Sequence, residues 1–272
     1  MLPMLLLAAA LPAPSPTPSP TPQRLLGLIR AVFRSHRPPP PYEVYTMERK
    51  QLNDRGFPDF AGSYTYKYWV RTSDDAALKR HVYRGDFRGT LEFDRPAFNE
   101  ARDPGPPTAD VFAPAPVTPR PVTFVPTPEP EGTPLRTIAT IVVAAEFDYH
   151  VVSVEPEDDL LHLVLTPLRD PERNRLRQLW VDAKTLELER FIATDRLFVE
   201  NDKTYPVIFD CKLDRLAAIP VVTACYGTVH GGYQGDGENV DFAFTDTSFP
   251  TFLPAWYFDP RDYAQHQTDA PI

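Results

Sequence analysis

The chain has 272 residues, enough for one large domain or two small ones, and 42 % of them are apolar, so a sizeable core can form. Its formal net charge of −9 argues against a nucleic-acid partner, which needs a basic face, and against an anionic membrane surface as the main target. The 33 prolines, against 12 glycines, indicate linkers and stiff loops and limit the share of regular structure.

The first 23 residues predict export. Residues 1–11 are nearly all apolar, are too few to span a bilayer, and include Ala8-Ala9-Ala10 as a small-x-small cleavage pattern, so we predict a signal peptide. No Lys or Arg precedes the apolar run, and the alternative is a short apolar start or a misplaced initiation site. Residues 12–23, PAPSPTPSPTPQ, predict an extended Pro/Ser/Thr-rich tether. We therefore expect a periplasmic or extracellular protein that is soluble after signal cleavage and has no transmembrane span.

The two cysteines, Cys211 and Cys225, lie fourteen positions apart. In an oxidising compartment they can form a disulfide, which the export signal favours. The alternative is two buried free thiols in neighbouring strands. Neither cysteine lies near the signal, so we expect no lipid-anchored N-terminus.

One amphipathic helix is predicted directly after the tether, in QRLLGLIRAVFRSHR (23–37). Its apolar positions at helical spacing are Leu25, Leu28, Ile29 and Val32, joined by Leu26 and Phe33. The arginines expected on its other side are Arg24, Arg30 and Arg34. Four consecutive prolines at 38–41 end it.

The pattern then changes to the period of a strand. Residues 42–52 and 63–71 predict two strands, and 77–95 predict one or two more, in a run of antiparallel hairpins. The second strand alternates sharply and places Tyr64, Tyr66, Tyr68 and Val70 on one face.

Residues 94–134 are too rich in proline to hold a central strand. A loop of this length inside a domain is either functional or wraps around something. Its apolar side chains predict that it packs on the rest of the molecule: Phe98, Val111, Phe112, Val122, Phe124 and Val125.

Strand signals continue from here to residue 249. Residues 136–155 predict a long or bent strand, with a helix over 134–145 as the alternative. Residues 159–168 place Leu161, Leu163 and Leu165 on one face, and 173–192 predict a hairpin with its turn at 182–185. Further strands are predicted within 196–201, 204–213, 218–230 and 238–249. The sum is one helix and about nine to eleven antiparallel strands, a sheet that must curl, split or close, with the helix against its concave face.

The sequence contains no pattern that demands catalysis or a metal. The six histidines lack the HxH and HExxH spacings of zinc sites. HGGYQGDGENVD (230–241) resembles a calcium loop only in composition, and a flexible hairpin loop explains it better. The acids of EPEDD (155–159) fall together in a predicted turn, and no GxSxG or phosphate-binding loop occurs. We therefore expect a protein that is not an enzyme, with no cofactor and no metal.

The sequence HLVLTPLRDPERNRLRQLWVDAKTLELERFIATDRLF (162–198) is similar to the middle of LolA-like proteins, the periplasmic lipoprotein-sorting carriers and their relatives. The similarity extends loosely over 24–95 and more closely over 136–250. It implies a mainly β (α+β) fold, a curved antiparallel half-barrel wrapped around an N-terminal helix, with an apolar cavity for lipid chains. This chain is longer, and the arginine and lid helices with which such carriers open and close have no recognisable counterpart.

The expected organisation is a signal peptide (1–11), a tether (12–23), one half-barrel domain (24–260) with a Pro-rich insertion at 94–134 that could act as a lid, and a C-terminal tail (261–272). The expected function is binding of a lipid or another apolar ligand, as carrier or sensor in the cell envelope. The partners are then lipid or lipoprotein acyl chains and an envelope protein. The predicted ligand-binding residues are Tyr64, Tyr66, Tyr68, Leu161, Leu163, Leu165, Leu25, Leu28, Ile29 and Val32. The alternative is an envelope protein-interaction module with a filled core and no ligand cavity.

Overall fold

The structure, a computed structural model, describes residues 20–35, 40–53, 55–74, 76–82, 91–94, 105–115, 148–200, 203–231, 238–259, 262 and 265–266. These residues contain one long helix, α1 (Pro22–Ser35), and one short 3₁₀ helix, η3 (Ala255–Phe258). The strands are β1 (Tyr42–Leu52), β2 (Pro58–Arg71), β3 (Ala76–His81), β4 (Leu91–Asp94), β5 (Tyr149–Glu157), β6 (Leu160–Pro167), β7 (Leu176–Asp182), β8 (Leu188–Glu200), β9 (Lys203–Leu216), β10 (Ile219–Val229) and β11 (Asn239–Ser248).

The eleven described strands form a single antiparallel sheet in the order β4-β3-β2-β1-β11-β10-β9-β8-β7-β6-β5. Sequence neighbours pair except for β4 and β5, which form the two ends of the order, and β1 pairs with β11 and so joins the early and the late hairpins. The predicted mainly β fold, with about nine to eleven antiparallel strands and an N-terminal helix, is confirmed.

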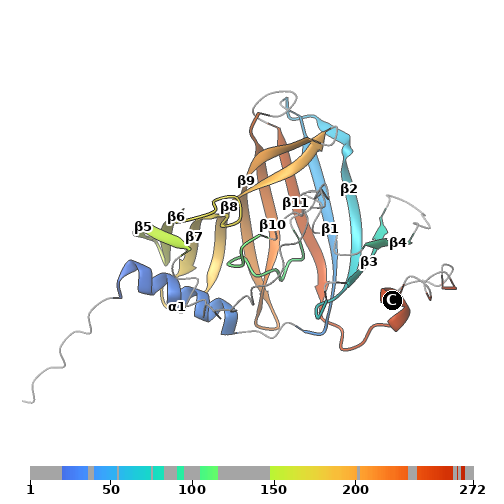
Figure 1. Ribbon diagram of the computed structural model, residues 1–272, viewed down its shortest axis with the longest axis horizontal. Coiled ribbons are helices and arrows are strands. Elements are labelled where there is room, and N and C mark those ends of the chain that lie inside the picture. Colours follow the sequence, from blue (N-terminus) through green and yellow to red (C-terminus); the bar gives the residue numbers. More distant parts are fainter. Residues whose placement is uncertain are drawn as a thin grey trace, which may run out of the picture.

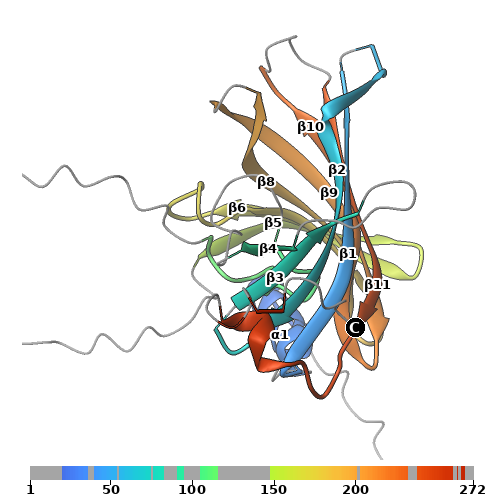
Figure 2. The ribbon, with the colours of Figure 1, turned by 90° about the vertical axis from the view of Figure 1, so that its right-hand side faces the viewer.

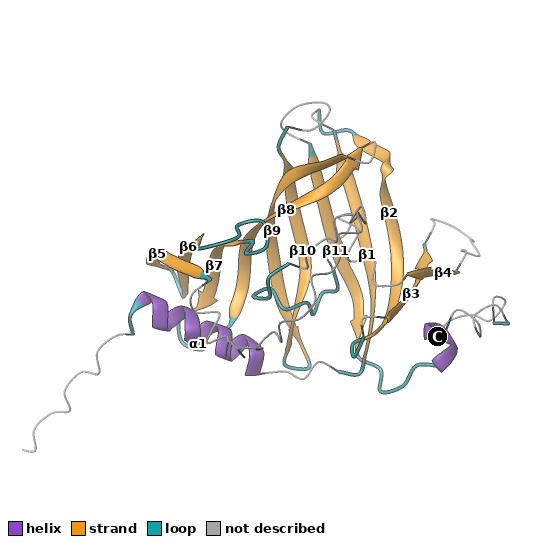
Figure 3. Cartoon of the chain, viewed as in Figure 1, coloured by secondary structure: helices purple, strands orange, loops and turns teal. Residues whose placement is uncertain are grey.

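The sheet is strongly curved, and α1 lies against its concave side (Figures 1 and 2). Figure 3 shows the long strands β8, β9, β10, β11, β1 and β2 as the tall part of the sheet, with β5, β6 and β7 beside α1. We call the face that carries α1 the inner face and the opposite face the outer face. Since side chains alternate along a strand, each strand contributes one set of residues to each face.

The predicted turn at 182–185 illustrates how local chemistry fixes a hairpin. The Asp182 carboxylate accepts hydrogen bonds from the backbone N–H groups of Lys184 (2.8 Å) and Thr185 (2.7 Å) and from the Thr185 hydroxyl (3.1 Å). Leu186, which closes the turn, has a φ of 61°. The turn therefore holds β7 and β8 in register through one aspartate.

The outer face carries a second, smaller apolar cluster at β1, β2 and β3. Here Val44, Trp69 and Leu78 are buried beneath Leu253 and Tyr257 of the C-terminal segment. The rings of Trp69 and Tyr257 meet edge to face, with centroids 6.0 Å apart. The segment around η3 therefore covers apolar surface that the sheet alone would expose.

Several predictions lie outside the described residues. These are the signal peptide (1–11), most of the tether (12–23), the strand or helix before residue 148, the loop residues 232–237, and Phe98, Val122, Phe124 and Val125. Within the described part of the chain, no helix has both the length and the apolar character needed to cross a membrane.

Candidate functional site

The inner face carries a continuous row of side chains that runs across nine strands. Register partners connect Tyr64 (β2) through β1, β11, β10, β9, β8, β7 and β6 to Val154 (β5). In order, the row is Tyr64, Arg49, Phe242, Cys225, Cys211, Phe191, Leu179, Leu163 and Val154. Arg49 is the one charged member of this row.

A second row runs beside the first and contains a close approach of two strands. It consists of Gln51, Val240, Gly227, Phe209, Ala193 and Leu176. A Cβ atom at Gly227 would lie 2.5 Å from the ring of Phe209 and 2.5 Å from the carbonyl oxygen of Val240. Only glycine therefore allows the Phe209 ring and the Val240 carbonyl to lie this close to β10 at position 227.

Arg49 lies at the far end of the inner face from α1, among polar and aromatic groups. Its guanidinium donates to the Gln51 Oε1 (3.0 Å) and to the Tyr64 hydroxyl (3.3 Å) and lies over the rings of Tyr64 and Phe242. Gln51 in turn donates to Asp59 (3.3 Å). This cluster gives one end of an otherwise apolar face a polar character.

The inner face seats α1 beside the edge strand β5. The Gln23 side-chain amide donates to the carbonyl oxygen of Tyr149 (2.8 Å) and its oxygen accepts from the N–H of Val151 (3.4 Å). One glutamine thus occupies two backbone groups at the edge of β5, as a neighbouring strand would. Leu25 and Ile29 then pack into the core of the inner face.

Of the helix residues predicted to face the sheet, Leu25 and Ile29 are buried in its core and Leu28 is largely exposed. Leu28 is 41 % exposed, whereas Ile29 is fully buried, and Val32 is half-buried. The buried stripe consists of Leu25, Leu26, Ile29, Arg30 and Phe33. The predicted stripe and the buried stripe share Leu25 and Ile29. The buried stripe also contains Phe33, whose ring contacts the ring of Phe112, and this contact favours the orientation of the helix that is observed.

Arg30, expected on the solvent side of α1, is also buried. Its guanidinium lies over the ring of Phe112, 5.4 Å from the ring centroid. Burial, together with the nearby charge of Arg34, lowers the pKa of Arg30. Sequence periodicity cannot predict this position, because the aromatic partner comes from a segment with no periodicity of its own.

That segment, residues 105–115, crosses the inner face, and we call it the strap. Figure 1 shows it in green in front of the tall strands, and the N–H of Val222 in β10 donates to the carbonyl oxygen of Pro107 (2.8 Å). Phe112 is only 2 % exposed, and Val111 is half-buried. The prediction that apolar residues of 94–134 pack on the molecule is therefore confirmed for these two.

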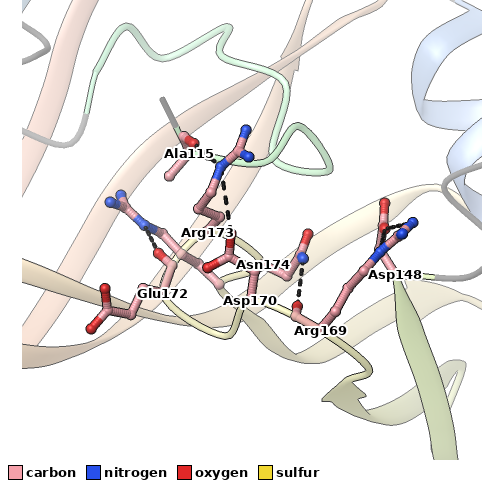
Figure 4. Close-up of polar contacts among 8 residues, drawn as sticks. Ala115, Asp148, Arg169, Asp170, Glu172, Arg173 and Asn174 are labelled. Atoms are coloured by element: carbon pink, nitrogen blue, oxygen red, sulfur yellow. Dashed lines mark hydrogen bonds and ion pairs between the residues drawn. The ribbon is translucent and has the colours of Figure 1, made fainter. Parts of the chain in front are cut away.

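The far end of the strap is fastened to the loop between β6 and β7 (Figure 4). The N–H of Ala115 donates to the carbonyl oxygen of Arg173 (2.9 Å), and the Arg173 Nε donates back to the carbonyl oxygen of Ala115 (3.1 Å). In the same loop Asn174 donates to the carbonyl oxygen of Arg169, whose guanidinium bonds Asp148. The strap is thus tied to a loop that is itself braced against the start of β5.

The inner face is covered unevenly. Tyr68 is almost fully buried and stacks on Tyr45, with ring centroids 5.0 Å apart. Tyr64 and Tyr66, farther along the same face of β2, are half-buried, as is Tyr205 near the start of β9. Figure 2 shows β8 and β2 diverging at this end of the sheet. Along this face of β2 the covering of the side chains therefore decreases from Tyr68 to Tyr66 and Tyr64.

The structure places the predicted ligand-binding residues of the strands on the inner face. Tyr64 and Leu163 lie in one row, at opposite sides of the sheet. Leu163 and Leu165 are buried and Leu161 is half-buried. Whether these residues, with Tyr66, Tyr68, Leu25, Leu28, Ile29 and Val32, contact a ligand stays a prediction.

Cys211 and Cys225 lie directly opposite each other in β9 and β10, in the middle of the first row. A disulfide joins their Sγ atoms. Both residues are buried in the inner-face core, so the bridge is part of the floor of the candidate site.

One ion pair lies at the margin of the inner face. The Arg175 guanidinium bonds the Asp195 carboxylate at 2.5 Å. Burial raises the pKa of Asp195, against the opposing attraction of Arg175.

Over the described ranges no group of three or more His, Cys, Asp or Glu side chains converges as a metal site would require.

No protein-family model matches the sequence, and no curated protein matches it. Among solved structures, a LolA superfamily protein from Nitrosomonas europaea is similar, with 14 % identity, a TM-score of 0.43, and coverage of 89 % of this chain and 99 % of the other. A DUF1329 family protein from Desulfovibrio piger is also similar, with 14 % identity, a TM-score of 0.36, and coverage of 88 % and 96 %. The similarity to LolA-like proteins that the sequence predicted is found again here as a likeness of fold.

Proposed function

We propose that this protein is a non-enzymatic binding protein that holds an acyl chain or another elongated apolar ligand against the inner face of its sheet. The observation that supports this is the row across nine strands, apolar except for Arg49, which ends at the half-buried side chain of Tyr64, with the half-buried Tyr66 beside it on the same face of β2. Such a surface needs no catalytic groups to bind, because burial contributes about 0.8 kcal/mol per methylene group. About ten buried methylenes would supply about 8 kcal/mol before the entropic cost of association.

We further propose that the protein is exported and works as a carrier or a sensor in the cell envelope. The apolar start of the sequence and the Cys211–Cys225 bridge support export, since disulfides persist in oxidising compartments. Expression with the full N-terminus, followed by N-terminal sequencing of the secreted protein, tests this: cleavage near residue 11 is expected. Retention of Met1 in a cytoplasmic product would contradict it.

A second candidate is a protein-interaction module whose core is filled and holds no ligand. The observation that favours it is the filling of part of the inner face by α1 and by Phe112 of the strap. A fold of this kind would bind an envelope protein through its exposed surface instead. Ligand measurements separate the two candidates.

The test is lipid extraction of the purified protein, analysed by mass spectrometry, together with displacement of a fluorescent fatty acid. We expect a co-purified lipid or displaceable binding, and a weaker signal in Tyr66→Ser, which alters the inner face. The matched control is Tyr226→Ser on the outer face, where Tyr226 is exposed, and it should bind like the wild type. No co-purified lipid and no displaceable binding would favour the filled module.

A further inference from the structure

The strap is a separate layer over the inner face, held at four places by different kinds of contact. Pro107 bonds β10 through the N–H of Val222 (2.8 Å), and the Thr108 hydroxyl bonds Glu43 of β1 (2.6 Å) in a buried contact. Asp110 forms an ion pair with Arg34 of α1 (3.0 Å). Ala115 exchanges two hydrogen bonds with Arg173. The strap therefore bridges the helix and widely separated parts of the sheet.

Phe112 is the single aromatic side chain of the strap, and it is inserted into the apolar core of the inner face. Its ring meets that of Phe33 edge to face, with centroids 5.4 Å apart. This ring therefore occupies apolar surface of the kind that an acyl chain would cover. It reaches the core from a segment that has only turns, and not from a strand or a helix.

The contacts that hold the strap differ in strength. The ion pair of Asp110 with Arg34 is partly exposed and contributes little, because exposed pairs are worth about 0–1 kcal/mol. Its own residues form no strand pair in the described chain, and the burial of Phe112 and the buried bond of Thr108 to Glu43 hold its centre. A ligand that covered the apolar surface now covered by Phe112 would replace the stabilisation that the burial of this ring gives to the strap.

We propose that the strap is an autoinhibitory cover: Phe112 occupies the part of the inner face beside α1, which an elongated apolar ligand that enters past Tyr64 and Tyr66 would also cover. Release of the strap then precedes or accompanies ligand entry. This inference rests on the proposed function, since it assumes that the inner face is the ligand site. The apparent affinity is the intrinsic affinity reduced by the fraction of molecules whose strap is released.

The first experiment locks the strap. Glu43→Cys/Thr108→Cys, joined by a short bis-methanethiosulfonate linker, should bind a fluorescent fatty acid about tenfold more weakly than before linkage. A reductant should restore the binding. Wild-type protein passed through the same linker and reductant steps is the control for the native disulfide.

The second experiment removes the competitor. Phe112→Ala should bind the probe several-fold more tightly, while Phe244→Ala, which removes the same kind of ring from β11 and leaves the strap in place, should not. Asp110→Ala loosens the strap without altering the core and should give a smaller gain, which covers the case that Phe112→Ala does not fold.

The outcomes separate the two proposals. Binding that is unchanged in the linked protein, or equal gains in Phe112→Ala and Phe244→Ala, would overturn the strap proposal and leave the ligand site intact. Weaker binding on linkage and a gain confined to the strap variants would support it. A probe that binds neither the wild type nor any variant would overturn the ligand site, and the strap proposal with it.

Discussion

The packing of α1 leads to a sharp prediction about two adjacent residues. Ile29 is fully buried against the inner face, whereas Leu28 is 41 % exposed. Replacing Ile29 by alanine removes three buried carbon atoms and leaves a cavity, which typically costs about 2–5 kcal/mol. Leu28→Ala removes the same number of carbons from a position that is already largely in water, so it should cost less than about 1 kcal/mol.

The assay is urea unfolding followed by tryptophan fluorescence and by circular dichroism, with equal slopes required for the comparison. A loss of about 3 kcal/mol would also lower the melting temperature by about 6–12 °C in a chain of this size. Equal destabilisation by the two substitutions would refute the orientation of the helix. A larger loss of stability in Leu28→Ala than in Ile29→Ala would show that the helix buries the side that contains Leu28, as periodicity alone predicted.

Three further predictions follow from the strands. Mass analysis without reduction should find the mature protein two hydrogens lighter than the dithiol form, with Cys211 and Cys225 resistant to alkylation in the native state. Loss of the bridge should lower the free energy of unfolding by about 3 kcal/mol. Free alkylation of both cysteines would rule the bridge out. Gly227→Ala should be strongly destabilising, because the added Cβ would lie 2.5 Å from the Phe209 ring and 2.5 Å from the carbonyl oxygen of Val240. Unchanged stability in urea would contradict this close approach. Hydrogen bonds from the turn amides lower the pKa of Asp182 below 3.8, so its stabilisation is present above pH 3.8 and is lost as the pH falls through the lowered pKa. The stability difference between wild type and Asp182→Asn should therefore shrink in acid, and a difference independent of pH would refute the assignment.

The strands could be predicted because their alternation is local. Residues 42–52 were predicted as a strand, and β1 has these bounds. The alternation of Tyr64, Tyr66 and Tyr68 placed them correctly on one face. The turn at Asp182 was predictable for the same reason, because its hydrogen bonds join residues two and three positions apart.

The inner-face rows could not be predicted, because they depend on register across the whole sheet. Irregularities interrupt several strand pairs, for example between Val222 and Ala224 in β10 and between Val151 and Ser153 in β5. Each one shifts which residues share a face. Sequence reasoning thus placed Tyr64 and Leu163 on the alternating faces of their own strands without finding that both belong to the same row.

The orientation of α1 and the strap could not be predicted for a related reason. Both Leu28 and Phe33 fit a helical stripe, and the choice between the stripes is made by Phe112, about eighty residues away in sequence. The proline-rich composition around Phe112 excluded a strand but carried no signal of where the segment packs. The burial of Arg30 follows from that contact and has no local signal either.

The central claim is that the inner face of the sheet receives the apolar ligand. Photo-crosslinking with a diazirine-bearing fatty acid, followed by peptide mapping, tests it most directly. The account predicts adducts on inner-face residues near Tyr64 and Tyr66 of β2, and their suppression by excess unlabelled fatty acid. Adducts confined to outer-face residues such as Tyr226, or labelling that no competitor reduces, would contradict it.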